Sequence, residues 1–329
     1  MTPEELHHRI FDFRLAAAVF AGVDLGLFAA LVSGPIDACT LATKAGCDRR
    51  GVEVWLSALR AAGVVREGTE GWEVEPGLEP ALDPSSEHYL GHLFQHDLWH
   101  WTRWAGLSQT LITGRPSQRN HFDRHLSDPL VLRQFLPNYN LAMEESARGA
   151  ADRIAAFIAQ HPARRVADFG GGTGELLIAT CRRMPDVRGI LVDHAFALED
   201  ASERIESASL TERIRLVDLD FERNALDEPY DVAVLSRVLM GFSRGRAARA
   251  VASVATGLEP GGMVLVHDFA VDSLAGAMLG LDMFLNTGGS THSRSEIERF
   301  FEAAGLVACG ESPVLPHTRL WIGRKEVAS

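Results

Sequence analysis

The chain has 329 residues, of which 46% are hydrophobic, and its formal net charge at pH 7 is −12. This length allows two domains with a core each. No run approaches the roughly 18 apolar residues of a membrane-spanning helix, and residues 1–14 carry too many charges for a secretory signal. We therefore expect no membrane partner and a cytoplasmic location.

The N-terminal third has the pattern of a winged helix-turn-helix. Residues 41–46 and 49–62 predict two helices, and residues 63–74 predict a small hairpin after them. Such a module can bind DNA, but its second helix offers only three arginines, set against two acidic residues. Because DNA phosphates need a basic face, we expect no nucleic-acid partner.

Residues 86–112 predict a pair of amphipathic helices with a histidine at every fourth position, namely His88, His92, His96 and His100. A four-residue step is little more than one helical turn, so adjacent histidines share a face and two of them can chelate a metal ion. The same spacing is compatible with histidines that line a pocket or an interface, or that act in acid–base chemistry. A connection and a long helical run follow, up to residue 160.

A glycine-rich turn opens the C-terminal half. Residues 166–169 predict a buried strand that contains Asp168, and the glycines from Gly170 to Gly174 lead from it into a helix at 176–183. Glycines let backbone N–H groups come close to a ligand, and the helix N-terminus directs its unpaired donors to the same place. The segment therefore predicts a site for a nucleotide-type cofactor.

Acidic residues close the next two expected strands. Asp193 follows the apolar run 189–192, where a doubly wound sheet places a ribose-binding carboxylate. Asp220 and Phe221 end the strand expected to begin at residue 215, and they suit the amine and the ring face of adenine. Together with the glycine turn, these residues predict an adenosine cofactor.

These motifs resemble the small-molecule methyltransferases that use S-adenosylmethionine and carry an N-terminal dimerisation domain, a group that includes plant phenolic and bacterial polyketide O-methyltransferases. The resemblance extends from about Leu15 to about Trp321, and its most specific motif is D-x-G-G-G-x-G at 168–174. It implies an α/β chain with a C-terminal Rossmann-like methyltransferase domain at 161–329, preceded by a mainly α-helical winged-helix dimerisation domain at 1–112. Residues 113–160 would form a helical connection that roofs the acceptor pocket, and the chain would be a homodimer.

The resemblance also implies roles for individual residues around S-adenosylmethionine and a small-molecule acceptor. The cofactor-binding residues would be Asp168, Gly170, Gly172 and Gly174 at the methionine side, Asp193 at the ribose, Asp220 and Phe221 at the adenine, and Ser236 and Arg237 near the methionine end. The residues on the acceptor side would be His96, His100, Tyr139, Met143, Met240, Phe242, Met283 and Asn286.

One position departs from the family pattern. Many phenolic O-methyltransferases of this group have a His-Asp-Trp triplet where this chain has Met240-Gly241-Phe242. In those enzymes the histidine takes the hydroxyl proton as the methyl group is transferred. Met240 cannot accept a proton, although Phe242 can still form an aromatic wall, so the histidine mechanism is not carried over.

Three possibilities follow for the chemistry. O-methylation is the family default and needs mainly positioning when the acceptor is already acidic. Alternatively another group acts as the base, and the catalytic candidates are His292, Asp268, His267 and Tyr139. A metal ion is not expected, but His292 is its best candidate ligand, and with His267, Asp268 or a histidine of 86–112 it would support C-methylation of an enolisable acceptor such as a 2-oxo acid. The third possibility is a non-methylating cofactor-binding or regulatory protein.

Overall fold

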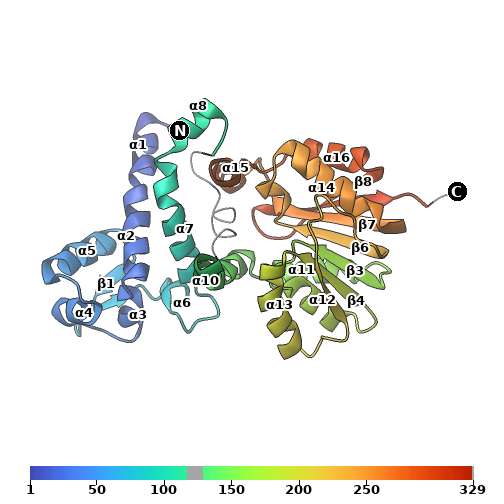
Figure 1. Ribbon diagram of the computed structural model, residues 1–329. Helices are drawn as coiled ribbons and strands as arrows, with labels where there is room; N and C mark the ends of the chain where they lie inside the picture. The colour runs from blue at the N-terminus through green and yellow to red at the C-terminus, as the bar shows by residue number, and fades with distance from the viewer. Residues whose placement is uncertain (117–128, 328–329) are drawn as a thin grey trace. The chain divides into compact units, whose positions relative to one another are not determined.

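The computed structural model describes residues 1–116 and 129–327, and the chain forms two compact units (Figure 1). Within the described residues, the first unit holds 1–105 and 129–146, and the second holds 106–116 and 147–327. No helix in these described ranges is long and apolar enough to cross a membrane.

The first unit is mainly helical. Its helices are α1 (Pro3–Phe11), α2 (Phe13–Asp24), α3 (Leu27–Val32), α4 (Ala38–Ala45), α5 (Arg49–Ala61), α6 (Glu79–Leu82), α7 (Gly91–Trp104) and nearly all of α10 (Pro129–Ala147). The strands β1 (Val65–Glu67) and β2 (Trp72–Val74) pair antiparallel directly after α5. This is the helix–helix–hairpin order predicted for a winged module.

Local signals fix the ends of the two helices that precede the hairpin. Asp37 and Asp48 cap α4 and α5, because each side chain accepts a hydrogen bond from backbone N–H groups of the first turn. Gly46 ends α4 in the left-handed conformation at φ 65°. The apolar faces of these helices then close a core that includes the fully buried side chains of Leu41 and Leu56.

The second unit contains a seven-stranded sheet of order β5-β4-β3-β6-β7-β9-β8. Its strands are β3 (Arg165–Phe169), β4 (Arg188–Asp193), β5 (Ile214–Asp218), β6 (Tyr230–Ser236), β7 (Leu258–Phe269), β8 (Leu306–Pro313) and β9 (Thr318–Lys325). β3 to β7 pair in parallel, whereas β9 is antiparallel to both β7 and β8. The predicted α/β, Rossmann-like fold is confirmed.

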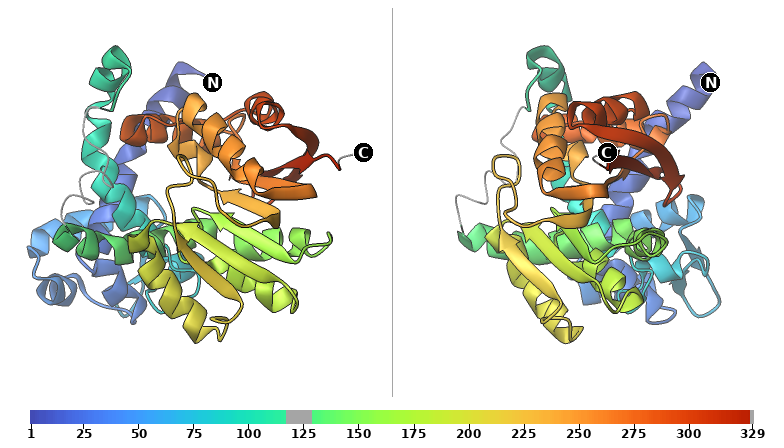
Figure 2. Two further views of the ribbon diagram at one scale, coloured as in Figure 1. Left: turned by 45° about the vertical axis from the view of Figure 1, so that its right-hand side comes forward. Right: turned by 90° about the vertical axis from the view of Figure 1, so that its right-hand side faces the viewer.

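Helices cover both faces of this sheet (Figure 2). Those whose side chains pack in its two cores are α11 (Ala150–Ile158), α12 (Glu175–Arg183), α13 (Ala195–Ser207), α14 (Arg244–Thr256) and α16 (Arg294–Ala303). The second unit also contains α8 (Leu107–Thr113) and α15 (Leu274–Thr287). The residues of β3 alternate between two cores, since Ala167 and Phe169 pack with α14 and α16 while Val166 packs with α11 and α12. Chain order reverses between β3 and β6, and such a switch point opens a crevice at the carboxyl ends of the strands.

Candidate functional site

The glycine turn between β3 and α12 has the backbone that its sequence predicts. Gly170, Gly172 and Gly174 have φ values of 71°, 53° and 79°, in the left-handed region that favours glycine. Gly171 is needed for space, because a Cβ there would lie 2.3 Å from a methyl carbon of Leu191 and 2.6 Å from Oδ2 of Asp168. The turn therefore brings bare backbone close to the carboxyl ends of β3 and β4.

Asp168 lies in β3, directly before the last residue of the strand, and its side chain is buried under the glycine turn. The residue is 1% exposed, and its Oδ1 has no hydrogen-bond partner among residues 1–116 and 129–327. Burial, and to a smaller extent the charge of Asp193, raises the pKa of Asp168 to about 7. A buried carboxyl group with an unused acceptor atom is suited to pair with a cationic ligand.

Asp193 ends β4 and holds the glycine turn in place. Its Oδ2 accepts the N–H of Gly172 at 2.9 Å, and its Oδ1 accepts the N–H of His194 at 2.7 Å. Burial raises the pKa of Asp193, although both N–H donors act in the opposite direction. The structure thus brings together the three elements that sequence placed at the cofactor: the turn, Asp168 and Asp193.

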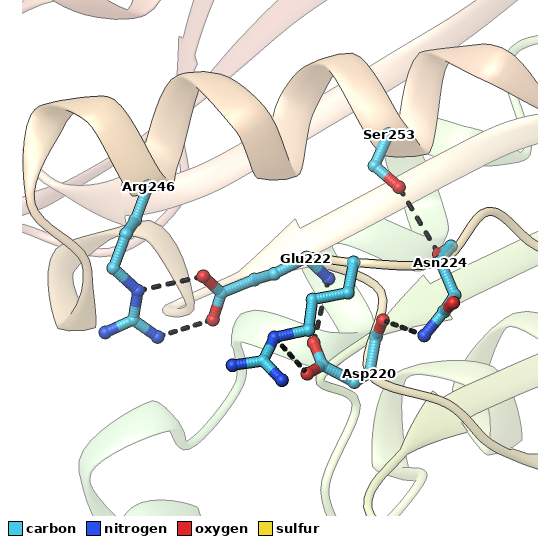
Figure 3. Close-up of polar contacts among 6 residues, drawn as sticks. Asp220, Glu222, Asn224, Arg246 and Ser253 are labelled. Carbon is cyan, nitrogen blue, oxygen red and sulfur yellow. Dashed lines mark hydrogen bonds and ion pairs between the residues drawn. The ribbon is translucent and has the colours of Figure 1, made fainter.

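Asp220 and Phe221 lie in a turn after β5, which ends at Asp218, three residues before the expected end at Phe221. Phe221 packs edge-on against Phe169, with ring centroids 5.6 Å apart. Asp220 accepts the N–H of Glu222 at 3.2 Å, and its Oδ2 lies 3.4 Å from Nε of Arg223 (Figure 3).

His267 lies in the interior of the sheet. Its Nδ1 is 2.9 Å from Oγ of Ser236 in β6, and its Nε2 is 2.9 Å from Oγ1 of Thr318 in β9. Burial lowers the pKa of His267 to about 3, so the ring is neutral at pH 7. Arg237, which follows β6, has a φ of 59° and donates its N–H to the carbonyl of His267 at 2.6 Å. A non-glycine residue in this conformation is strained, which is a feature often found at functional sites.

Met240 lies in a short 3-10 turn, η1 (Leu239–Gly241), that is held from two sides. Asp268 accepts the N–H of Met240 at 2.9 Å and that of Phe269 at 2.8 Å, and burial raises its pKa to about 6. Nε2 of His292 lies 3.0 Å from the carbonyl oxygen of Leu239 and must donate to it. His292 and Asp268 therefore both contact the backbone of the turn that replaces the family triplet.

His292 is itself buried, and burial lowers the pKa of its imidazole. Because Nε2 carries the proton, Nδ1 is an acceptor, and it has no partner within the described ranges. Gly289 brings its backbone against the same turn, since a Cβ there would lie 2.3 Å from the carbonyl oxygen of Met240. Sequence reasoning chose His292 but gave no sign of these backbone contacts.

The remaining acceptor-side residues fall in both units. In the first, His96 lies with ring centroids 4.4 Å from His100 and 5.6 Å from Tyr139. Met143 belongs to α10, in the same unit. Met283 and Asn286 belong to α15, and Phe242 follows η1, in the second.

The histidine series of residues 86–112 does not form one helical face. His88 precedes α7, which begins at Gly91. Nδ1 of His92 lies 2.6 Å from a carboxylate oxygen of Glu145, and the other oxygen of Glu145 accepts the N–H of Leu93 at 2.8 Å. No group of three His, Cys, Asp or Glu residues in the part of the chain that the structure describes is placed to hold a metal ion. Within the described part of the second unit, His292, His267 and Asp268 are thus not part of such a group.

The raised pKa of Asp168 predicts how stability depends on pH. Between the ordinary value of 3.8 and about 7, the folded protein keeps a proton that the unfolded chain has lost. The free energy of unfolding without ligand should therefore fall as pH rises through this window. Asp168→Asn should flatten the fall and stabilise the protein at pH 7 by about 1 kcal/mol or more.

Urea unfolding across the same pH range measures this effect. Asp227→Asn is the matched control, because Asp227 is exposed and its loss should leave the pH dependence unchanged. An equally steep fall in Asp168→Asn would show that Asp168 does not bind the proton.

Comparisons with known proteins identify the family of the chain. A family model described as an O-methyltransferase domain matches residues 104–307. A mitomycin biosynthesis 6-O-methyltransferase from Streptomyces lavendulae is 28% identical over 91% of this chain and 89% of that protein. The aclacinomycin 10-hydroxylase RdmB from Streptomyces purpurascens is 32% identical over 63% of this chain and 57% of that protein.

A solved structure has the same fold. It is the O-methyltransferase NcsB1 from neocarzinostatin biosynthesis, in complex with S-adenosylmethionine and 2-hydroxy-5-methyl naphthoic acid. The superposition gives a TM-score of 0.80 at 21% identity and covers 95% of this chain and 96% of that one. Because the family model matches more than half of its length, this chain belongs to the O-methyltransferase domain family.

Proposed function

We propose that the chain transfers the methyl group of S-adenosylmethionine to an oxygen atom of a small aromatic acceptor. S-adenosylmethionine-dependent O-methylation of a small acceptor is the function that the family and its relatives support. The observation that carries the proposal is the arrangement of Asp168, the glycine turn and Asp193 at the carboxyl ends of two neighbouring parallel strands.

The residues present fit this cofactor. Its methionine end carries positive charge, which suits the buried carboxyl group of Asp168 with its unused Oδ1. The glycine turn offers backbone that a ligand can approach closely. Each oxygen of Asp193 accepts one backbone N–H and keeps a second lone pair for a ribose hydroxyl. When bound, the cofactor supplies an electrophilic methyl group.

The residues of the turn at 239–242 offer an apolar surface for an acceptor but no side chain that can act as a base. The side chain of Met240 is 7% exposed and cannot accept a proton. Its N–H is fixed by Asp268, and the preceding carbonyl group is fixed by His292. The turn therefore contributes to catalysis by positioning the acceptor. The acceptor needs a hydroxyl group that is already acidic, as in a phenol that carries an electron-withdrawing carbonyl group.

A second candidate function is a reaction other than methylation in the same site. The relative RdmB is named a 10-hydroxylase, so a related chain has a different activity. Met240 favours this alternative, because it leaves the turn without the proton acceptor that many phenolic O-methyltransferases use. C-methylation has no comparable observation in its favour.

Transfer of a carbon-13 methyl group from labelled S-adenosylmethionine, followed by carbon NMR, tests the proposal. The panel holds phenols and 2-oxo acids, with and without chelator. We expect a methoxy signal that survives chelator. A carbon-bound methyl signal that is lost with chelator would instead establish metal-assisted C-methylation. Cofactor binding without transfer to any phenol would favour the non-methylating alternative.

Asp193→Ala should raise the dissociation constant of S-adenosylhomocysteine by about tenfold or more, since hydrogen bonds to a charged group contribute about 1.5–3 kcal/mol. Asp193→Asn should have a smaller effect, because the amide oxygen can still accept the N–H of Gly172. Titration calorimetry measures both, with thermal unfolding to confirm folding. Unchanged affinity in Asp193→Ala would remove this residue from the cofactor site.

We also propose a homodimer formed through α1 and α2. Leu6 and Ile10 lie one helical turn apart on α1, Phe13 is the first residue of α2, and the three are 46%, 61% and 49% exposed. An exposed apolar face of this kind is typical of an association surface. Leu6→Glu with Ile10→Glu should convert the dimer to a monomer in sedimentation velocity. Val54→Glu is the control, because Val54 is 64% exposed on α5, outside that face. A wild-type chain that sediments as a monomer would contradict the proposal.

A further inference from the structure

The turn that follows β5 is anchored to α14. Asp220 begins this turn, and its carbonyl group accepts the N–H groups of Arg223 and Asn224 at 3.1 and 3.0 Å. Two side chains of α14 reach the turn, Arg246 and, more weakly, Ser253, whose Oγ lies 3.4 Å from the carbonyl oxygen of Asn224 (Figure 3). They are seven residues apart and thus lie on one face of the helix.

Arg246 makes the stronger of these two contacts. Its Nε and Nη2 donate to the two carboxylate oxygens of Glu222 at 2.8 and 2.5 Å, as the parallel dashed lines of Figure 3 show. The side chain of Glu222 is 19% exposed, so the pair is partly shielded from solvent. This two-pronged geometry is specific to arginine and fixes the orientation of both groups.

Arg246 also contacts the segment that precedes its own helix. The guanidinium carbon lies 4.4 Å from the centroid of the Phe242 ring, within the range of a cation–π contact. One side chain thus touches both Phe242, the proposed acceptor wall, and Glu222, which follows the proposed adenine-binding residues Asp220 and Phe221.

The position of Arg246 within α14 shows that its role is tertiary. The first turn of α14 holds Arg244 and Arg246 and no acidic residue, an arrangement that the helix dipole disfavours. Each arginine instead pairs with a carboxylate from another element, Arg244 with Glu296 and Arg246 with Glu222. Helix stability alone does not call for a cation at either position.

We propose that Arg246 is a positioning residue that couples the adenine side of the cofactor site to the acceptor wall, so that cofactor binding steadies the turn that carries Met240 and Phe242. The inference rests on the proposed function, because it takes Asp220 and Phe221 as the adenine contacts. A ligand that fixes the turn at 220–224 also fixes Glu222, and through Arg246 it restrains the Phe242 ring. Opening of the turn at 239–242 then becomes rarer.

Hydrogen exchange of backbone amides reports this opening directly. The N–H groups of Gly241 and Phe242 donate within the turn, to Val238 and Leu239 at 3.1 and 2.9 Å, so both exchange when the turn opens. In the wild-type chain, saturating S-adenosylhomocysteine should slow exchange at 218–224 and should also slow it at 239–242, by about fivefold or more. In Arg246→Met the first effect should remain and the second should be lost.

Three variants make the test specific. Glu222→Gln should reproduce the loss, and it carries the test if Arg246→Met does not fold. Arg246→Lys keeps the charge but not the two-pronged geometry, so it should restore only part of the slowing. Arg244→Met removes the other arginine–carboxylate pair of the same helical turn and should leave the ligand-induced slowing intact.

The outcomes distinguish failure of the coupling through Arg246 from failure of the proposed cofactor binding. Slowing at 239–242 that persists in both Arg246→Met and Glu222→Gln would overturn the coupling while leaving cofactor binding in place. A wild-type chain that binds S-adenosylhomocysteine without slowing at 239–242 would do the same. Absence of binding to the wild-type chain would overturn both.

Discussion

The hydrogen bond between the N–H of Gly172 and the carboxylate of Asp193 joins the features on which the proposed site depends. It ties the glycine turn after β3 to the end of β4, the neighbouring parallel strand. Asp193 is thereby held close enough to influence the carboxyl group of Asp168, which lies beneath the turn. Burial, and to a smaller extent the charge of Asp193, raises the pKa of Asp168 to about 7, so below this pH the protein without ligand keeps a proton on Asp168. A cationic ligand would instead stabilise the ionised carboxyl group of Asp168.

Buried ionisable groups also hold the turn at Met240. In the family triplet a histidine takes the proton, whereas here the nearby ionisable groups, Asp268 and His292, hold backbone atoms of the turn. Burial lowers the pKa of His292 and so favours the neutral imidazole, which donates one N–H to the carbonyl oxygen of Leu239. The turn therefore offers apolar side chains and no base. Under the proposed function such a turn would still support methyl transfer, because the sulfonium methyl group is strongly electrophilic and alignment supplies much of the rate.

Local sequence predicts the cofactor side of the proposed site for a physical reason. Parallel strands end at one edge of the sheet, so an acid or a glycine that closes an apolar run must lie there. Asp168, Asp193 and the glycine turn were found in this way. Asp220 was placed at the end of a strand, but β5 stops at Asp218, because the chain turns on hydrogen bonds that involve Asp220 itself. Strand β8, whose exposed residues show no long apolar run, went unrecognised.

Contacts between residues far apart in the chain could not be predicted from patterns. Asp268 reaches Met240 across 28 residues, His292 reaches Leu239 across 53, and Arg246 reaches Glu222 across 24. The spacing of these pairs in the sequence does not show that they are in contact. Each contact joins segments that only the tertiary fold brings together. Asp268 and His292 were recognised as site residues only through family resemblance, and Arg246 was not recognised. Periodicity and strand ends thus predict where a ligand site is expected, whereas the contacts that hold its turns in place become visible only in the folded chain.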